Sequence, residues 1–454
     1  MMKEKLRGRI QGGVGFITLL VAEVMLFQGV EPFASWFYCF VWWAYILIVD
    51  SVIYELKGDS LIINRTREFL WLIPWSVVIW LIFELMNVLM KNWYYVNVID
   101  SLWARWLGYF LAYSTVLPGI FETTELLDTI GLFKKKRSAK RVHLEKKWLK
   151  VSCMVGVLLF VSLLLFPRFC FPFSWLGFIF LLEPVNYWLG GRSLLRAWER
   201  GNWQRLYHLL LAGMVCGLSW EFWNYWARTK WIYTVPFFEE LKLFEMPMLG
   251  FLGFLPFAVE CYVIYNFICL LGRREGWERG SESLVKGSPL RYPAQIALAV
   301  GFFIFSILSF RAIDTYTVNS YSSFLKDLDF ITPQLIKRLE EMGIRTTDDF
   351  LRTVNDQETT EDLSQELQVS KDEVKEWTKH VRLIALKGLG IENFYLLKKL
   401  EIDRVSKLVP LKPEKLHQDL MLLVQTDGKR KEVPTLSMVK IWIQEARKQN
   451  AETL

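Results

Sequence analysis

The sequence predicts an all-α fold, a polytopic helical membrane protein that ends in a small all-α soluble domain. Hydrophobic residues make up 53% of the 454 residues, and there are 21 Trp and 33 Phe. The long apolar runs stop near residue 312, and the sequence that follows is mixed and charged. A chain with this distribution has two regions that face different solvents.

Nine windows are long enough to cross a hydrocarbon core of about 30 Å, which needs roughly 20 residues of helix. Open strand edges are excluded from lipid, and no alternating strand pattern occurs, so these spans are expected to be helices. The nine windows are residues 11–30, 33–54, 69–91, 103–126, 149–166, 168–189, 205–227, 246–270 and 293–311.

Basic clusters between the spans predict the orientation. The densest runs from Lys134 to Lys147, and two others cover 190–205 and 272–279. The positive-inside rule places all three in the cytoplasm if the N-terminus is cytoplasmic. Nine crossings of a cell inner membrane then put the C-terminal domain on the opposite, periplasmic side. A site for anionic lipid or nucleic acid is the alternative use of these clusters.

Two long stretches match one another in order, which indicates an internal duplication. Asp50 aligns with Glu183 and Ser60 aligns with Ser193 at one offset. Other matches pair Tyr54 with Tyr187, Gly58 with Gly191, Arg67 with Arg200, Glu84 with Glu221, Asn87 with Asn224, Trp93 with Trp231, Tyr95 with Tyr233 and Pro118 with Pro256. Each copy holds four spans, an even number, so the two copies are expected to be parallel.

The duplication divides the chain into five segments. Two are four-helix transmembrane repeats, one is a basic cytoplasmic linker, one combines a basic loop with the ninth transmembrane helix, and the last is the soluble domain. The two transmembrane repeats are residues 1–130 and 148–271, and the basic cytoplasmic linker between them is 131–147. The basic loop with the ninth transmembrane helix is 272–318, and the soluble domain is 319–454.

A Glu-x-x-Asn pattern occurs once in each copy, at Glu84 with Asn87 and at Glu221 with Asn224. Residues three apart share a helix face, and an ionisable group inside a membrane span usually faces the bundle or a cavity. With Trp231 and Tyr233 these four residues are the candidate ligand-binding set. The alternative is structural, with the polar pair joining helices by hydrogen bonds.

A second acidic pattern, Pro-x-x-x-Glu, places Glu122 and Glu260 one span later. At 1.5 Å per residue they lie very roughly 15 Å from the level of the other two acids, so we expect two layers of carboxylates. The candidate catalytic or proton-carrying residues are therefore Glu84, Glu122, Glu221 and Glu260. Arg67 and Arg200 are candidates for an anionic head group, with ordinary interfacial arginines as the alternative.

Histidine and cysteine give no cofactor signature. The four His residues are scattered, and none of the six Cys residues has a Cys-x-x-Cys partner. The sequence therefore predicts no metal site, haem or structural zinc, and leaves any other cofactor unknown.

The C-terminal region resembles the helix-hairpin-helix family in two copies, at residues 331–351 and 389–409. Their apolar positions coincide at an offset of 58: Ile336 with Phe394, Leu339 with Leu397, Ile344 with Ile402 and Phe350 with Leu408. The resemblance implies a Gly-x-Gly hairpin whose amides meet phosphate, and only the second copy has one, Gly388 with Gly390. Acidic residues balance the basic ones here, which disfavours nucleic acid and favours a protein partner.

The membrane region is loosely similar to the membrane-embedded lycopene cyclases, which carry acids and Pro in repeated helices. That similarity implies proton-driven chemistry on an apolar substrate, although "PFAVE" has one acid where those motifs have adjacent acids. Three functions remain open. We expect a membrane scaffold or assembly component, whose bundle holds a lipid-like or pigment-like ligand. One alternative is an intramembrane enzyme that acts on an isoprenoid or lipid. The other is a proton- or cation-coupled transporter.

Overall fold

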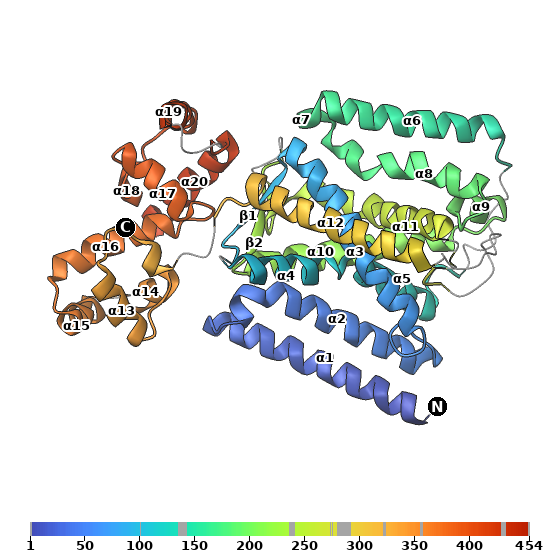
Figure 1. The fold of residues 1–454 in the computed structure, drawn as a ribbon, viewed down its shortest axis with the longest axis horizontal. Helices are drawn as coiled ribbons and strands as arrows, with labels where there is room; N and C mark the ends of the chain where they lie inside the picture. The colour runs from blue at the N-terminus through green and yellow to red at the C-terminus, as the bar shows by residue number, and fades with distance from the viewer. Residues whose placement is uncertain are drawn as a thin grey trace. The chain divides into compact units, whose positions relative to one another are not determined.

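The protein is mostly helical, and a computed structural model shows how the helices are arranged (Figure 1). The structure describes residues 2–99, 101–134, 143–235, 241–272, 274, 276–278, 292–320, 324–354, 357–427 and 433–452. Residues 135–142 of the basic linker expected at 131–147, and most of the basic loop that begins at 272, lie outside the described residues.

The chain forms two compact units. The first, called the apolar unit here, consists of Met1–Trp93, Trp103–Arg228 and Val235–Thr315. The second, the C-terminal unit, consists of Tyr94–Leu102, Thr229–Thr234 and Tyr316–Leu454. Two short segments from between the expected spans therefore fold with the C-terminal domain, which the sequence did not predict.

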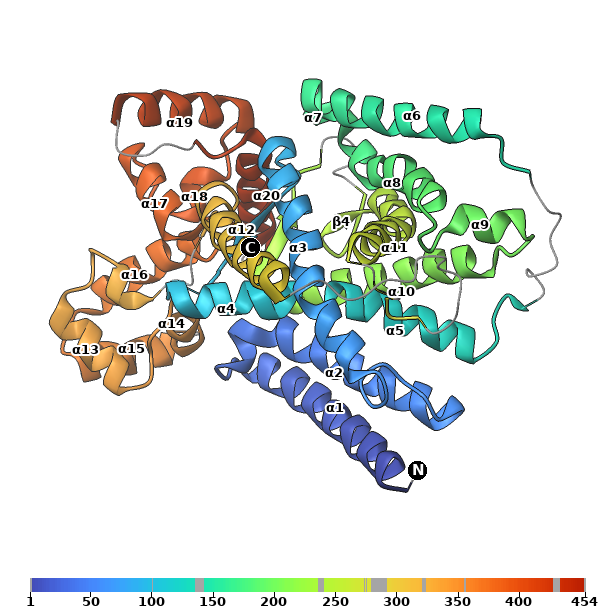
Figure 2. The ribbon, with the colours of Figure 1, turned by 45° about the vertical axis from the view of Figure 1, so that its right-hand side comes forward.

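The first half of the apolar unit contains five helices. α1 and α2 lie side by side along their lengths (Figures 1 and 2). α4 and α5 replace the single span expected at 103–126. Between them the hydroxyls of Ser114 and Thr115 bond back to carbonyls, and Pro118 has no N–H to continue the helical ladder. The bounds are α1 Met2–Gln28, α2 Phe33–Lys57, α3 Thr66–Met90, α4 Leu102–Tyr113 and α5 Val116–Thr129.

The second half continues with helices α6 to α12 and two short 3-10 helices, η2 and η3. A small antiparallel pair, β3 and β4, precedes η3. The bounds are α6 Lys146–Leu165, α7 Pro167–Cys170, η2 Phe171–Trp175, α8 Gly177–Trp188, α9 Leu194–Glu199, α10 Gln204–Trp226, β3 Lys242–Leu243, β4 Met246–Pro247, η3 Met248–Gly253, α11 Phe254–Leu271 and α12 Tyr292–Tyr316.

Seven helical segments of the described chain are long and apolar enough to cross a membrane. They are Lys3–Gln28, Phe33–Lys57, Thr66–Met90, Lys146–Leu165, Pro167–Trp188, Met248–Leu271 and Pro293–Tyr316. The other two expected spans correspond to the broken pair α4 and α5 and to α10, which carries several polar residues. The coarse prediction of a helical protein with membrane-length helices is confirmed, and the count of nine stays a prediction.

The turns after α2 and α8 share one hydrogen-bonding pattern. Asp50 accepts bonds from the Ser60 hydroxyl (2.9 Å) and the Ile62 N–H (2.7 Å). Glu183 accepts bonds from the Ser193 hydroxyl (2.6 Å) and the Leu195 N–H (2.9 Å). In both turns the donors follow the acid by 10 and 12 residues. The acids and serines that the sequence alignment paired thus make equivalent contacts.

The C-terminal unit contains eight helices. Its two similar stretches use the same turn, in which Ile344 donates to the Leu339 carbonyl and Ile402 to the Leu397 carbonyl. All eight apolar positions aligned above are buried in one core with Trp377 and Trp442. The bounds are η4 Leu325–Asp327, α13 Pro333–Glu341, α14 Thr347–Thr353, α15 Gln357–Leu367, α16 Lys371–Ile384, α17 Gly390–Lys399, α18 Val405–Leu408, α19 Pro413–Asp427 and α20 Leu436–Glu452.

Two strands complete this unit. β1 (Trp93–Val96) follows α3 and β2 (Lys230–Tyr233) follows α10, and the two form one sheet. The segment after α12 adds to β1, because Tyr95 donates to the Thr317 carbonyl and accepts from the Asn319 N–H, both at 2.8 Å. Two segments that the sequence alignment matched thus form one sheet in this unit.

Candidate functional site

Glu84 and Asn87 are both fully buried on α3, but their side chains make different contacts. Glu84 Oε1 accepts indole N–H bonds from Trp80 (2.8 Å) and Trp93 (3.3 Å). Asn87 closes the turn into β1: its amide donates to the Trp93 carbonyl (2.8 Å) and its oxygen accepts the Asn92 N–H (2.9 Å). The Asn87 side chain therefore caps a chain reversal, a structural task.

Glu221 and Asn224 are equally buried on α10, among aromatic rings. The Trp42 ring centroid lies 5.3 Å from that of Trp220 and 5.1 Å from that of Trp223. Such pairs contribute about 0.5–1.5 kcal/mol beyond their burial. This part of the candidate ligand set lies in a packed aromatic layer between α2 and α10.

The remaining members of the set are placed differently. Trp231 and Tyr233 lie on β2, half-buried, in the C-terminal unit. The structure thus divides the six candidate ligand-binding residues between the two units. Arg67 and Arg200, the candidates for an anionic head group, are both exposed. The buried arginines near them in sequence are Arg65 and Arg192, which the sequence argument missed.

Glu122 and Glu260 occupy α5 and α11 and are fully buried. Glu260 Oε1 accepts the Phe178 N–H at the beginning of α8 (2.9 Å), so a backbone donor holds this carboxylate. Both oxygens of Glu122 lack a hydrogen-bond donor within the described structure. The two equivalent acids therefore have different surroundings.

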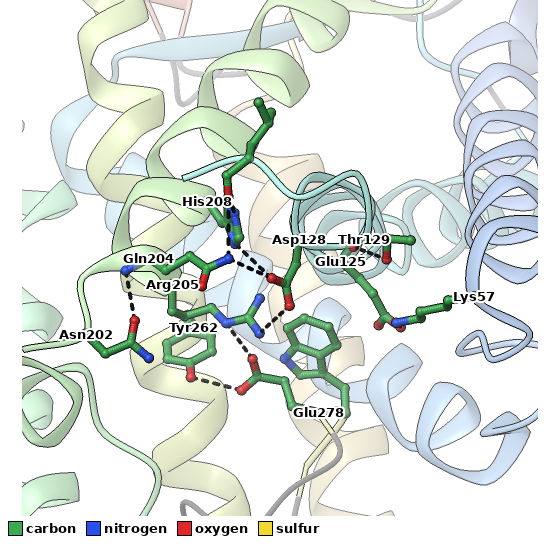
Figure 3. A network of polar contacts seen from close by, with 12 residues as sticks. Lys57, Glu125, Asp128, Thr129, Asn202, Gln204, Arg205, His208, Tyr262 and Glu278 are labelled. Atoms are coloured by element: carbon green, nitrogen blue, oxygen red, sulfur yellow. Dashed lines mark hydrogen bonds and ion pairs between the residues drawn. The ribbon is translucent and has the colours of Figure 1, made fainter. Parts of the chain in front are cut away.

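A polar network, drawn in Figure 3, joins the ends of α5, α10 and α11. Its centre is Glu278, whose side chain is 6% exposed. The carboxylate lies 3.0 Å from Arg192 Nη1 and 2.7 Å from Arg205 Nε, and it accepts the Tyr262 hydroxyl at 3.0 Å. The sequence argument assigned this segment to a basic loop and overlooked Glu278 and Tyr262.

Asp128 at the end of α5 connects the network to α10 (Figure 3). Gln204 Nε2 donates to it at 2.9 Å, Arg205 Nη2 lies 3.6 Å away, and His208 Nδ1 lies 3.9 Å away. The other ring nitrogen of His208 is 2.8 Å from the Leu132 carbonyl. Hydrogen bonds and ion pairs thus join α5 to α10 at this end of the unit.

Glu125, one turn before Asp128, holds two more cations. Lys57 Nζ lies 2.6 Å from Glu125 Oε1, and Arg65 pairs with the same oxygen. Arg65 also donates to the Trp277 carbonyl at 2.6 Å. Within the described chain the four cations here (Lys57, Arg65, Arg192 and Arg205) face four acids (Asp59, Glu125, Asp128 and Glu278). Balanced charges of this kind favour a structural role over anion binding.

α12 is fixed by a second buried charge pair. Asp314 binds Arg105 of α4 in bidentate fashion, with Nε at 2.9 Å and Nη2 at 3.0 Å. Trp106 Nε1 (2.9 Å) and the Tyr109 hydroxyl (3.0 Å) donate to the same carboxylate. An acid in the last turn of an apolar helix was the sequence signal that could have revealed this clamp.

In the C-terminal unit, His380 and Asp403 have shifted pKa values. Burial lowers the pKa of His380, whose ring lies 4.8 Å from that of Phe330. The folded unit therefore resists protonation at His380, and acidification below the ordinary histidine value of about 6.5 disfavours folding. Hydrogen bonds from Arg404 lower the pKa of Asp403 to about 2, so its contribution persists until the pH falls below about 4.

The Gly388–Gly390 hairpin is covered by other parts of the same unit. The Gly388 carbonyl accepts from the Asn319 amide and from Trp442 Nε1 (2.9 Å). A Cβ on Gly388 would lie 2.9 Å from the Tyr94 hydroxyl, and one on Gly390 would collide with Ser320. Intramolecular contacts thus occupy the surface that the resemblance assigned to phosphate.

Metal binding has no support in the described part of the chain, where no three His, Cys, Asp or Glu side chains are grouped as a metal ion would require.

Comparison with known proteins identifies one segment. Residues 330–449 match a family model described as "Domain of unknown function (DUF4332)". No curated protein and no solved structure matches the chain. The C-terminal helices α13 to α20 thus contain a DUF4332 domain.

Proposed function

We propose that the protein is a membrane scaffold, in which a duplicated helical bundle presents the DUF4332 domain to a protein partner. The bundle has nine spans in two parallel repeats plus α12. The N-terminus is cytoplasmic and the domain lies on the periplasmic side of a cell inner membrane. The equivalent contacts of Asp50 and Glu183 support the parallel duplication, since each acid binds donors 10 and 12 residues further on.

The observation that carries this proposal is the composition of the C-terminal unit. Strands β1 and β2, one from each sequence copy, fold together with the DUF4332 helices. Tyr94, Val96 and Ile232 from these strands form a buried cluster with Met438 and Ile441 of α20. The unit that contains the domain is thus connected along the chain to both halves of the bundle, as a scaffold would require.

Two features support a protein as the partner. The glycine hairpin, which in helix-hairpin-helix proteins meets phosphate, is occupied by Tyr94, Asn319 and Ser320. Acidic and basic residues also balance along the domain, so it carries no net positive charge that would attract nucleic acid.

The other functions have less support from the contacts. Glu84 accepts hydrogen bonds from two indole N–H groups, and Asn87 caps a turn. The first Glu-x-x-Asn pair therefore has a structural role in the described chain. A lipid-like or pigment-like ligand beside Glu221 would have to fit the aromatic layer around Trp42. An enzyme or transporter would use the acid left without donors, Glu122.

Photo-crosslinking in cells tests the scaffold proposal. A photoreactive residue replaces Leu422, which is 62% exposed on α19, or Asp372, whose side chain is 94% exposed on α16. We expect one discrete protein adduct from the face that docks the partner. The control position is Trp103, 76% exposed on α4 of the apolar unit, which should give lipid adducts alone. Equal smears from all three positions would argue against a specific partner.

A further inference from the structure

Glu122 has the least compensated carboxylate of the described chain. It is 0% exposed, and it is the one carboxylate there with both oxygens buried and without a hydrogen-bond donor. Placing an ionised carboxylate in such surroundings without a partner is energetically unfavourable. The structure therefore has to neutralise this group in another way.

The side chain of Asp50 on α2 lies beside Glu122, near enough for a hydrogen bond between the two carboxyl groups. Asp50 already accepts three bonds, from Gln11 Nε2 (2.8 Å), the Ser60 hydroxyl (2.9 Å) and the Ile62 N–H (2.7 Å). Asp50 thus has the hydrogen-bond donors that Glu122 lacks. Two carboxylates have only acceptor oxygens, so the contact becomes a hydrogen bond when Glu122 carries a proton and donates it to Asp50.

The neighbouring charges do not compensate Glu122. Arg65, from the turn before α3, and Lys57 of α2 both pair with Glu125 on the α5 helix itself. From α2 the Tyr45 hydroxyl bonds to Thr123 (2.7 Å), and from α10 the Cys216 thiol lies 3.4 Å from the same Thr123. Glu125 and Asp59 pair with these two cations, so an ionised Glu122 would add an uncompensated buried charge.

We propose that Glu122 and Asp50 form a proton-binding site in the apolar unit, with one proton shared between the two carboxyl groups. The site takes up and releases that proton to water, and no covalent bond to carbon is made or broken. This activity goes beyond a scaffold, because it makes the bundle sensitive to protons. The acid aligned with Glu122 is placed differently, because Glu260 accepts the Phe178 N–H at 2.9 Å.

Infrared difference spectroscopy on the purified full chain in lipid, recorded between neutral and alkaline pH, tests this proposal. We expect a protonated carboxylic acid band in the wild type at neutral pH. The band should be lost in Glu122→Gln, altered in Asp50→Asn and unchanged in the matched control Glu260→Gln. Gln is neutral and can donate to Asp50, so Glu122→Gln should fold with wild-type stability.

A hydrophobic carbodiimide gives a second readout that needs no variant. The reagent labels protonated buried carboxyl groups, so mass spectrometry of the wild type should find the adduct at Glu122 at neutral pH. Absence of both the acid band and the adduct would overturn the proposal. A carboxylic acid band that remains in Glu122→Gln would also overturn it. So would a wild type that shows no such band but is thermally stabilised by sodium relative to choline, because that result indicates a bound cation.

Discussion

Asp314→Ala should destabilise the apolar unit by about 3–5 kcal/mol, because it leaves the buried Arg105 guanidinium without its carboxylate. Arg105 and Asp314 are 7% and 13% exposed, so water cannot replace the lost partner. Trp106 and Tyr109 also lose an acceptor. The measurement is the unfolding free energy or thermal midpoint of the full chain in detergent or lipid.

A double variant separates the contribution of the Arg105–Asp314 ion pair to stability from the contribution of apolar packing. Arg105→Met together with Asp314→Leu removes both charges, and replacing a buried ion pair by apolar residues is often neutral or stabilising. The double variant should therefore recover much of the stability that Asp314→Ala loses. If Asp314→Ala unfolds at the wild-type midpoint, the clamp contributes nothing and α12 is held by its apolar contacts alone.

Glu278→Ala should have an effect of similar size, about 3–5 kcal/mol, because the buried Arg192 and the partly buried Arg205 share this carboxylate. Arg192 Nη1 and Arg205 Nε lie 3.0 Å and 2.7 Å from it. The loss should weaken the joint between α10, α11 and the segment at 276–278. Thermal unfolding of the full chain measures the change, and limited proteolysis near residue 278 should become faster.

The control for Glu278 is Glu145, which pairs with Lys147 at 2.8 Å but is 53% exposed. Exposed pairs of this kind contribute about 0–1 kcal/mol, so Glu145→Ala should leave the midpoint nearly unchanged. A cycle with Arg192→Met should show a coupling of about 0.5–3 kcal/mol for the buried pair. Equal effects of Glu278→Ala and Glu145→Ala would contradict a structural role for the network.

Much of the helical architecture could be predicted from the sequence, because apolar runs report burial directly. Seven of the nine expected windows correspond to helices long and apolar enough to cross a membrane. The window at 103–126 is the instructive difference. Its apolar content is that of one span, but Ser114, Thr115 and Pro118 interrupt the backbone hydrogen bonding there. The aligned apolar positions of the DUF4332 domain are also buried, and within α13 and α17 they lie three residues apart, on one helix face.

The polar sites were harder to predict, because the sequence shows which residues are charged but not which charges meet. Glu84 and Glu122 were both singled out, yet one accepts two indole bonds and the other has no donor. Glu278 and Asp314 resemble ordinary charges at helix ends, and their partners lie 86 and 209 residues away in sequence. Long-range pairing of this kind follows from tertiary structure alone.

Hydrogen exchange on the full chain in lipid tests the scaffold's central feature, the folding of β1 with the C-terminal unit. The Tyr95 and Asn319 amides pair with Thr317 and Tyr95 carbonyls. We expect peptides covering 94–98 and 317–320 to be protected as strongly as the domain core around Phe394 and Trp442. Rapid exchange in 94–98 beside a protected core would show that the domain does not depend on the loops of the bundle, and would contradict the scaffold architecture.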